Sequence, residues 1–149
     1  MFKQNTWRLS GAAGIVLPLI ILLAPRMTKA QGNATTPWEA PEDATKVENP
    51  VKATPNGLKQ AAQMYQENCV PCHGKTGAGD GPAATSLTPK PANFTDAKLM
   101  SKATDGELFW KMSNGRGPMP AWKDQLSDTQ RWQLVNYLRT LAGKSTAAK

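Results

Sequence analysis

The chain has 149 residues, with 18 lysines and arginines against 11 aspartates and glutamates, and a formal net charge of +7 at pH 7. The lysines are spread along the chain rather than clustered, so the composition lacks the basic footprint of a nucleic-acid-binding protein. Two cysteines and one histidine are too few for a structural zinc site, which takes four protein ligands.

The first 30 residues have the pattern of a secretory signal peptide. Lys3 and Arg8 precede an apolar run at 11–24, and small residues follow at 28–30. The apolar run is shorter than the about 20 residues of a membrane-spanning helix. We therefore predict cleavage after Ala30, with an uncleaved membrane anchor as the alternative, and an exported or periplasmic protein in both cases. Loss of the leader's four basic residues would lower the net charge from +7 to +3.

By length, the remainder of the chain is one domain. Its first part, residues 31–56, is predicted to be an extended arm, because four prolines interrupt it and it shows no periodicity. Trp38 is the large apolar residue of this arm. We expect its side chain to pack on the domain.

The next segment has the spacing of an amphipathic helix, from Leu58 to Asn68. Its apolar residues recur three and four positions apart, and Asn56 is the predicted N-cap. The helix would end directly before Cys69. The apolar residues are Leu58, Ala61, Ala62, Met64 and Tyr65.

The helix leads into Cys69-Val70-Pro71-Cys72-His73, which has the Cys-x-x-Cys-His pattern of a c-type haem attachment site. Two thiols one helical turn apart can form thioether bonds with the two vinyl groups of one haem, and the adjacent imidazole can bind the iron. We therefore predict one covalent haem c, attached to Cys69 and Cys72, with His73 as the proximal iron ligand. The alternative is a dithiol redox pair, but such pairs usually lie in a βαβ context, and no strand-like alternation surrounds residue 69.

Residues 74–100 are rich in glycine and proline, and we predict a long loop that packs on the haem. The triplet Gly74-Lys75-Thr76 matches part of a phosphate-binding P-loop. The glycine required five positions earlier is replaced by Cys69. We therefore discard the P-loop interpretation.

Two further helices are predicted in the C-terminal part. Each opens on a capping box and ends before a glycine, at Gly115 and at Gly143. The capping boxes pair Thr104 with Glu107 and Ser127 with Gln130. The last helix carries a broad apolar stripe of Trp132, Leu134, Val135, Tyr137, Leu138 and Leu141, and residues 144–149 are predicted to be a frayed tail.

The second axial position of the iron has several candidates. Because His73 is the only histidine, ligation by two histidines of one chain is excluded. Met112 lies on the apolar face of a predicted helix, where methionine is often core filler. Met119 lies between two prolines, which fix the backbone and remove N–H donors, so we predict Met119 as the distal ligand. The alternatives are Met64, Met100, Met112, a lysine and an open site.

Ligation by His73 and Met119 predicts a function. A thioether ligand raises the reduction potential relative to a second imidazole, and two protein ligands leave no iron site for oxygen or a substrate. We therefore predict an electron carrier rather than an enzyme: a periplasmic carrier or an electron-transfer subunit of a respiratory complex. Its partners would be a donor and an acceptor protein, with no nucleic acid, and with a membrane only if the leader is retained. The alternative is a haem protein with an open distal site that acts as an enzyme or gas sensor.

Three features together resemble class I c-type cytochromes, particularly bacterial single-haem domains. They are the Cys69–His73 motif, the later stretch Gly117-Pro118-Met119-Pro120-Ala121-Trp122, and the aromatic-bearing last helix. The resemblance covers about residues 57–142. It implies an all-α cytochrome c fold, with about four short helices and long loops around one haem, in a domain at 57–143.

The resemblance also implies a crossing of the first and last helices. Ala61 and Tyr65 would meet Leu134 and Tyr137 there, with Ala61 in place of the family's glycine. His73 would be the proximal ligand and Met119 the distal one. The arm at 31–56 has no counterpart in the minimal fold, which suggests a subunit that docks on a larger assembly.

Overall fold

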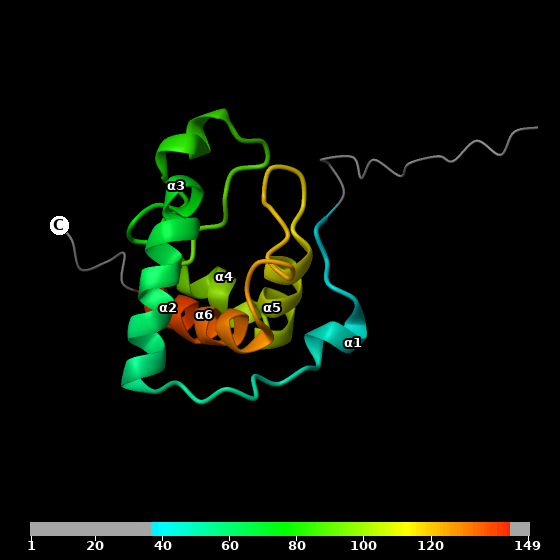
Figure 1. Ribbon diagram of the computed structural model, residues 1–149. Helices are drawn as coiled ribbons and strands as arrows, with labels where there is room; N and C mark the ends of the chain where they lie inside the picture. Colours follow the sequence, from blue (N-terminus) through cyan, green and yellow to red (C-terminus); the bar gives the residue numbers. More distant parts are fainter. Residues whose placement is uncertain (1–36, 144–149) are drawn as a thin grey trace, which may run out of the picture. The chain divides into compact units, whose positions relative to one another are not determined.

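The computed structural model describes residues 37–143, which lie within the compact unit Gly32–Lys149. The predicted leader, residues 31–36 and the C-terminal tail lie outside the described residues. The described part is helical, which confirms the all-α fold class, although it has six α-helices where about four were expected (Figure 1). In chain order the elements are α1 (Glu42–Thr45), α2 (Pro55–Asn68), α3 (Val70–His73), the 3-10 helix η1 (Pro82–Ser86), α4 (Ala97–Lys102), α5 (Asp105–Asn114) and α6 (Asp128–Leu141).

The core is built where α2 crosses α6 (Figure 1). Ala61 and Tyr65 of α2 are both fully buried, and the Tyr65 ring lies 5.3 Å from that of Tyr137 on α6. Leu134 is also buried, so the four predicted crossing residues come together. The other buried side chains of α6 are Arg131, Trp132, Val135, Leu138 and Leu141.

The starts of α2 and α6 follow from capping. The Ser127 and Gln130 capping box forms as predicted at α6. At α2 the predicted cap is wrong: Thr54, not Asn56, accepts a hydrogen bond from the Gly57 N–H at 3.1 Å. Pro55 occupies the first helical position, where a missing N–H costs nothing.

Helix α5 packs against α6 through aromatic rings. Phe109 and Trp132 stack with their centroids 3.9 Å apart. Thr104 caps α5 by accepting from the Glu107 N–H, as predicted. The carboxylate of Glu107 binds the Lys111 ammonium, so an i,i+4 ion pair takes the place of the reciprocal half of that capping box.

The segment at 74–100 is more regular than the predicted loop, since it contains η1 and α4. Asp96 caps α4 by accepting from the N–H groups of Lys98 and Leu99. The Tyr65 hydroxyl fastens the segment to the core by donating to the Gly74 carbonyl at 2.9 Å, and the Phe94 N–H closes the segment on itself by donating to the Gly77 carbonyl at 2.7 Å.

The arm before α2 is more ordered than predicted. It contains α1, and Asn49 donates to the Trp132 carbonyl and to Asn136 Oδ1 on α6. Asn136 in turn donates to the Val51 carbonyl at 2.8 Å. The described part of the arm is therefore bound to the helical core. Within 37–143, no helix is both long and apolar enough to cross a membrane.

Candidate functional site

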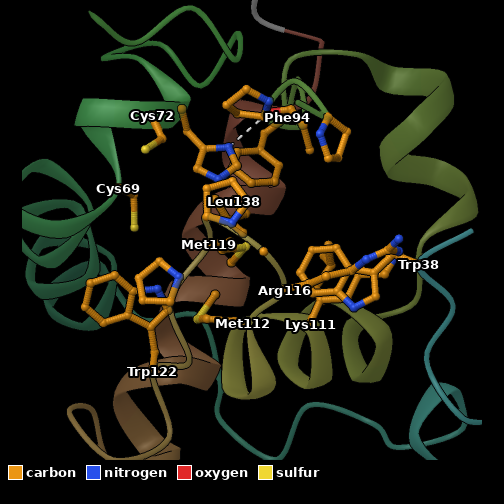
Figure 2. Close-up of a pocket in the computed structure, with 18 of the residues that line it drawn as sticks. Trp38, Cys69, Cys72, Phe94, Lys111, Met112, Arg116, Met119, Trp122 and Leu138 are labelled. Carbon is orange, nitrogen blue, oxygen red and sulfur yellow. Dashed lines mark hydrogen bonds between the residues drawn. The ribbon is translucent and has the colours of Figure 1, made fainter. Parts of the chain in front are cut away.

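A cavity of about 540 Å³ lies among α3, α4, α5, α6 and the loops that join them (Figure 2). This volume is within the usual range of ligand and cofactor pockets, about 300–1,000 Å³. All four residues predicted from the sequence, namely Cys69, Cys72, His73 and Met119, line this one cavity. Much of the remaining wall is apolar and includes Leu87, Phe94, Leu108, Trp122, Leu134 and Leu138.

The two cysteines are presented at the junction of α2 and α3. Cys69 continues the end of α2, and its N–H donates to the Tyr65 carbonyl at 2.9 Å. The His73 N–H donates back to the Cys69 carbonyl at 2.8 Å, which closes the short turn of α3. Both thiols are free and partly buried at the cavity wall. The spacing of the motif therefore places both sulfur atoms and the imidazole at one cavity.

The His73 imidazole is held by two contacts. Its Nδ1 lies 3.1 Å from the Ala92 carbonyl, and its ring stacks on Phe94 with centroids 4.6 Å apart. Because a carbonyl oxygen can only accept, Nδ1 is the protonated nitrogen and Nε2 keeps its lone pair. Burial lowers the pKa of His73, and the bond to Ala92 opposes this effect. The neutral imidazole is the form that binds a metal.

The environment of Cys69 differs from that of a reactive redox thiol. Burial, and next the neighbouring Cys72, raise the pKa of Cys69 to about 12. A dithiol oxidoreductase instead lowers the pKa of its nucleophilic cysteine, because the thiolate is the attacking species. The thiol pair of this site therefore fits a dithiol exchange enzyme poorly.

Gly81 packs directly on the attachment motif. Its N–H donates to the Cys72 carbonyl at 3.1 Å, and a Cβ at this position would lie 2.4 Å from the Pro71 carbonyl oxygen. A side chain is therefore excluded by backbone atoms that cannot give way easily. Sequence analysis did not single out Gly81, because nothing local indicates a contact with residues ten positions earlier.

Met119 is presented by a tight hairpin. Arg116 and Met119 form an isolated antiparallel bridge, with N···O distances of 3.0 and 3.1 Å. Between them lies Gly117 at φ +58°, the conformation that glycine supplies in two-residue hairpin turns. Gly115 has φ +62°, and a Cβ there would lie 2.5 Å from the Met119 carbonyl oxygen. The hairpin thus fixes the backbone of Met119 more firmly than the flanking prolines alone.

The residues that line the cavity reduce the number of methionines that could be the distal iron ligand. Met119 and Met112 both line it (Figure 2). Met64 and Met100 do not line it, and Met100 is only 1% exposed within α4. Met112 is buried on α5, at 6% exposure, and packs within the core cluster.

The charged residues of the wall suit the two carboxylates of a haem. Four cationic side chains line the cavity against one acidic side chain, that of Glu107. Together with a donor set of two thiols, one neutral imidazole and a thioether in an apolar cavity, they fit a haem. No local pattern of residues predicts this group of charges. The cationic residues are Lys90, Lys102, Lys111 and Arg116.

Comparison with known proteins identifies relatives over more than half of this chain. The cbb3-type cytochrome c oxidase subunit FixP of Azorhizobium caulinodans is 33% identical over 86 residues, which are 57% of this chain and 27% of that protein. Subunit CcoP of Azospirillum sp. strain B510 is 39% identical, over 54% of this chain and 27% of its own length. The chain therefore spans about a quarter of these oxidase subunits.

Two further relatives, one a cytochrome and the other a chain of a solved structure, match over a larger share of their own length. Cytochrome c6 of Euglena gracilis is 30% identical over 58% of this chain and 94% of its own length. A chain of the Kuenenia stuttgartiensis reducing HAO-like protein complex superposes with a TM-score of 0.55 and 28% identity, covering 64% of this chain and 49% of that one.

The matching family model spans residues 56–138, more than half of the chain, and describes subunit III of cbb3-type cytochrome c oxidase. It begins at the second residue of α2 and ends within α6, so it contains most of both crossing helices and the whole attachment motif. The chain therefore belongs to this family, as a single-haem c-type cytochrome domain that binds haem c covalently.

Proposed function

We propose that this chain transfers single electrons through a haem c bound by thioethers to Cys69 and Cys72, with His73 and Met119 as the axial iron ligands. It does so as an exported, periplasmic carrier or as an electron-transfer subunit of a respiratory complex. Redox proteins are its donor and acceptor.

One observation carries this proposal. The attachment motif and the Met119 loop are nearly fifty positions apart, yet Cys69, Cys72, His73 and Met119 line the same cavity. Their chemistry is that of a covalent haem site with a nitrogen and a thioether ligand. Core packing alone would not require two free thiols, the only histidine and a methionine at one apolar wall.

The chain's own residues suit outer-sphere electron transfer. When bound, haem c supplies an iron centre that gains or loses one electron. The Ala92 carbonyl and the Phe94 ring hold the His73 imidazole in one tautomer and one orientation. The Arg116–Met119 bridge holds the opposite thioether. Because the His73 imidazole and the backbone of Met119 are both held in place, little has to move when the charge of the site changes.

The cellular setting follows from the leader and the relatives. The signal-peptide pattern at 1–30 supports export, with a retained leader as the route to a membrane. Relatives named as subunits of cbb3-type cytochrome c oxidase support a place beside a respiratory enzyme. The mild positive charge expected for the chain without its leader suits acidic partner surfaces.

The axial assignment is tested by a pair of methionine variants. We expect the ferric wild-type protein to show the methionine-to-iron charge-transfer band and the ferrous protein to bind carbon monoxide poorly. Met119→Ala should lose the band and bind carbon monoxide promptly. Met112→Ala is the matched control: it should keep the band while losing about 2–5 kcal/mol of unfolding free energy, because a buried methionine is truncated.

Two outcomes would contradict the assignment. Loss of the band in Met112→Ala but not in Met119→Ala would move the distal ligand to α5. Prompt carbon monoxide binding by the wild-type protein would mean that the distal site is open, which is the property of a sensor or enzyme.

A further inference from the structure

Among the described residues, 37–143, the cavity has one wall residue that lies outside the family match. Trp38 lines the cavity, although the family model begins only at residue 56. Its ring covers the Lys111 ammonium of α5, which lies 5.6 Å from the ring centroid. We call residues 37–54, which carry Trp38 and α1, the strap.

The strap is seated on α5 by a close backbone contact. Gly106 lies in the first turn of α5, and a Cβ there would lie 2.0 Å from the Ala44 carbonyl oxygen and 2.8 Å from that of Val47. Farther along, Asn49 binds α6 through the Trp132 carbonyl. The strap is thus anchored after Trp38 by a contact that leaves no room for a side chain at Gly106 and by the Asn49 hydrogen bond.

Trp38 lies opposite the attachment cysteines. Figure 2 shows Cys69 and Cys72 at one side of the cavity and Trp38, with Lys111 and Arg116, at the other. In a haem the two vinyl groups and the two propionates occupy opposite edges of the macrocycle. Attachment of the vinyl edge to the cysteines would therefore direct the propionates toward Trp38 and these cationic residues.

We propose that Trp38 contacts the propionate edge of the haem and shields it from water, so that the strap is part of the cofactor site. This inference rests on the proposed attachment at Cys69 and Cys72, which orients the haem. Exclusion of water from a redox centre disfavours its more highly charged, oxidised state. The strap therefore raises the reduction potential of the haem. A domain that starts at residue 56 has no strap and would lack this increase.

The first test compares two tryptophan variants of the full chain with covalent haem. Trp38→Ala should have a lower midpoint potential than wild type by spectroelectrochemical titration. Trp110→Ala is the control, since Trp110 is a half-buried residue of α5 that does not line the cavity, and it should keep the wild-type potential. Equal potentials in wild type and Trp38→Ala, or an equal shift in both variants, would overturn the proposal.

A second variant moves the strap without changing the tryptophan. The Cβ of Gly106→Ala would collide with the strap backbone, so this variant should also lower the potential. It should in addition speed amide hydrogen exchange in residues 37–54. Faster exchange with an unchanged potential would overturn the proposal.

The haem stain and the charge-transfer band separate this inference from the proposed function. Both signals should persist in Trp38→Ala and Gly106→Ala, because neither variant touches an attachment or axial residue. If wild type lacked these signals, the proposed site would fail. If they persist and the potentials do not move, the strap inference alone fails.

Discussion

On the Cys69 side of the cavity, the proposed haem-binding residues lie at the end of α2 and in α3: Cys69 lies between the two helices, and Cys72 and His73 belong to α3. Gly81 packs against their backbone, and Ala92 and Phe94 hold the imidazole from a third segment. On the Met119 side, a short hairpin between α5 and α6 holds the thioether.

Substitutions on the two sides of the cavity are therefore expected to have different effects on haem binding. The Cys69 side would combine covalent attachment with several independent contacts, so damage there should reduce how much haem is bound. The Met119 side would depend on one turn and one coordinate bond. Damage there should leave the haem attached and change its spectrum and potential.

Removing both attachment thiols should have the largest effect. The Cys69→Ala, Cys72→Ala double variant cannot form a thioether, so haem staining of the denatured protein should be lost completely. Each single variant retains one sulfur and serves as the control, with staining at a reduced level. Staining of the double variant at the wild-type level would show that the haem is attached elsewhere.

Two glycines of the hairpin offer a matched pair. The Cβ of Gly115→Ala would lie 2.5 Å from the Met119 carbonyl oxygen, so the turn must shift, and we expect loss of the charge-transfer band with the haem still attached. Gly117→Ala meets no atom within 4 Å. It should keep the band and lose only about 1–2 kcal/mol of unfolding free energy, from its positive φ. Absorption spectra of the ferric variants measure this, and a band retained in Gly115→Ala would contradict the account.

Gly81→Ala should show the opposite pattern. Its Cβ would press on the backbone of the attachment motif, so the ratio of covalent haem to protein should fall, and unfolding free energy should drop by about 1–3 kcal/mol. The fraction that does carry haem should keep the charge-transfer band. A normal haem ratio with a missing band would reverse the proposed division between the two sides.

Tyr65→Phe should have the smallest effect at neutral pH. The variant removes the hydroxyl that donates to the Gly74 carbonyl, which costs about 1–2 kcal/mol of unfolding free energy. Burial, and next the charge of Cys69, raise the pKa of Tyr65. The folded state therefore favours the neutral phenol. The resulting contribution to the free energy of unfolding is fully present below the ordinary tyrosine pKa of about 10, and it is lost as the pH rises through the pKa of Tyr65 in the folded state.

The stability difference between wild type and Tyr65→Phe should accordingly shrink above pH 10. Denaturant titrations at neutral and alkaline pH measure it. Some alkaline sensitivity should remain in the variant, because burial also raises the pKa of Tyr137. A difference that grows with pH would contradict the assigned direction.

The features that could be predicted from the sequence are the local ones. The capping box at Ser127 and the apolar stripe after it give α6 its start and its buried face, because both depend on residues within a few positions. The attachment motif is likewise continuous in sequence. The position of Met119 between two prolines indicated a fixed presentation, although the bridge to Arg116 was not predicted.

The features that were missed depend on distant contacts or short elements. The Ala92 carbonyl that binds His73 is 19 positions away and is a backbone atom, so no residue type marks it. Trp38 was expected to pack on the domain, but no pattern could place it at the cavity. Helix α4 has only six residues, too few for periodicity, although Asp96 at its start was a usable capping signal.

The most direct test of the account is tandem mass spectrometry of the attachment peptide. Lys59 and Lys75 are consecutive trypsin sites, so digestion releases residues 60–75 as one peptide. The account predicts that this peptide carries the mass of one haem, with neither Cys69 nor Cys72 available to alkylating reagents. A haem-free peptide from the exported protein, with two alkylated thiols or a disulfide, would contradict it.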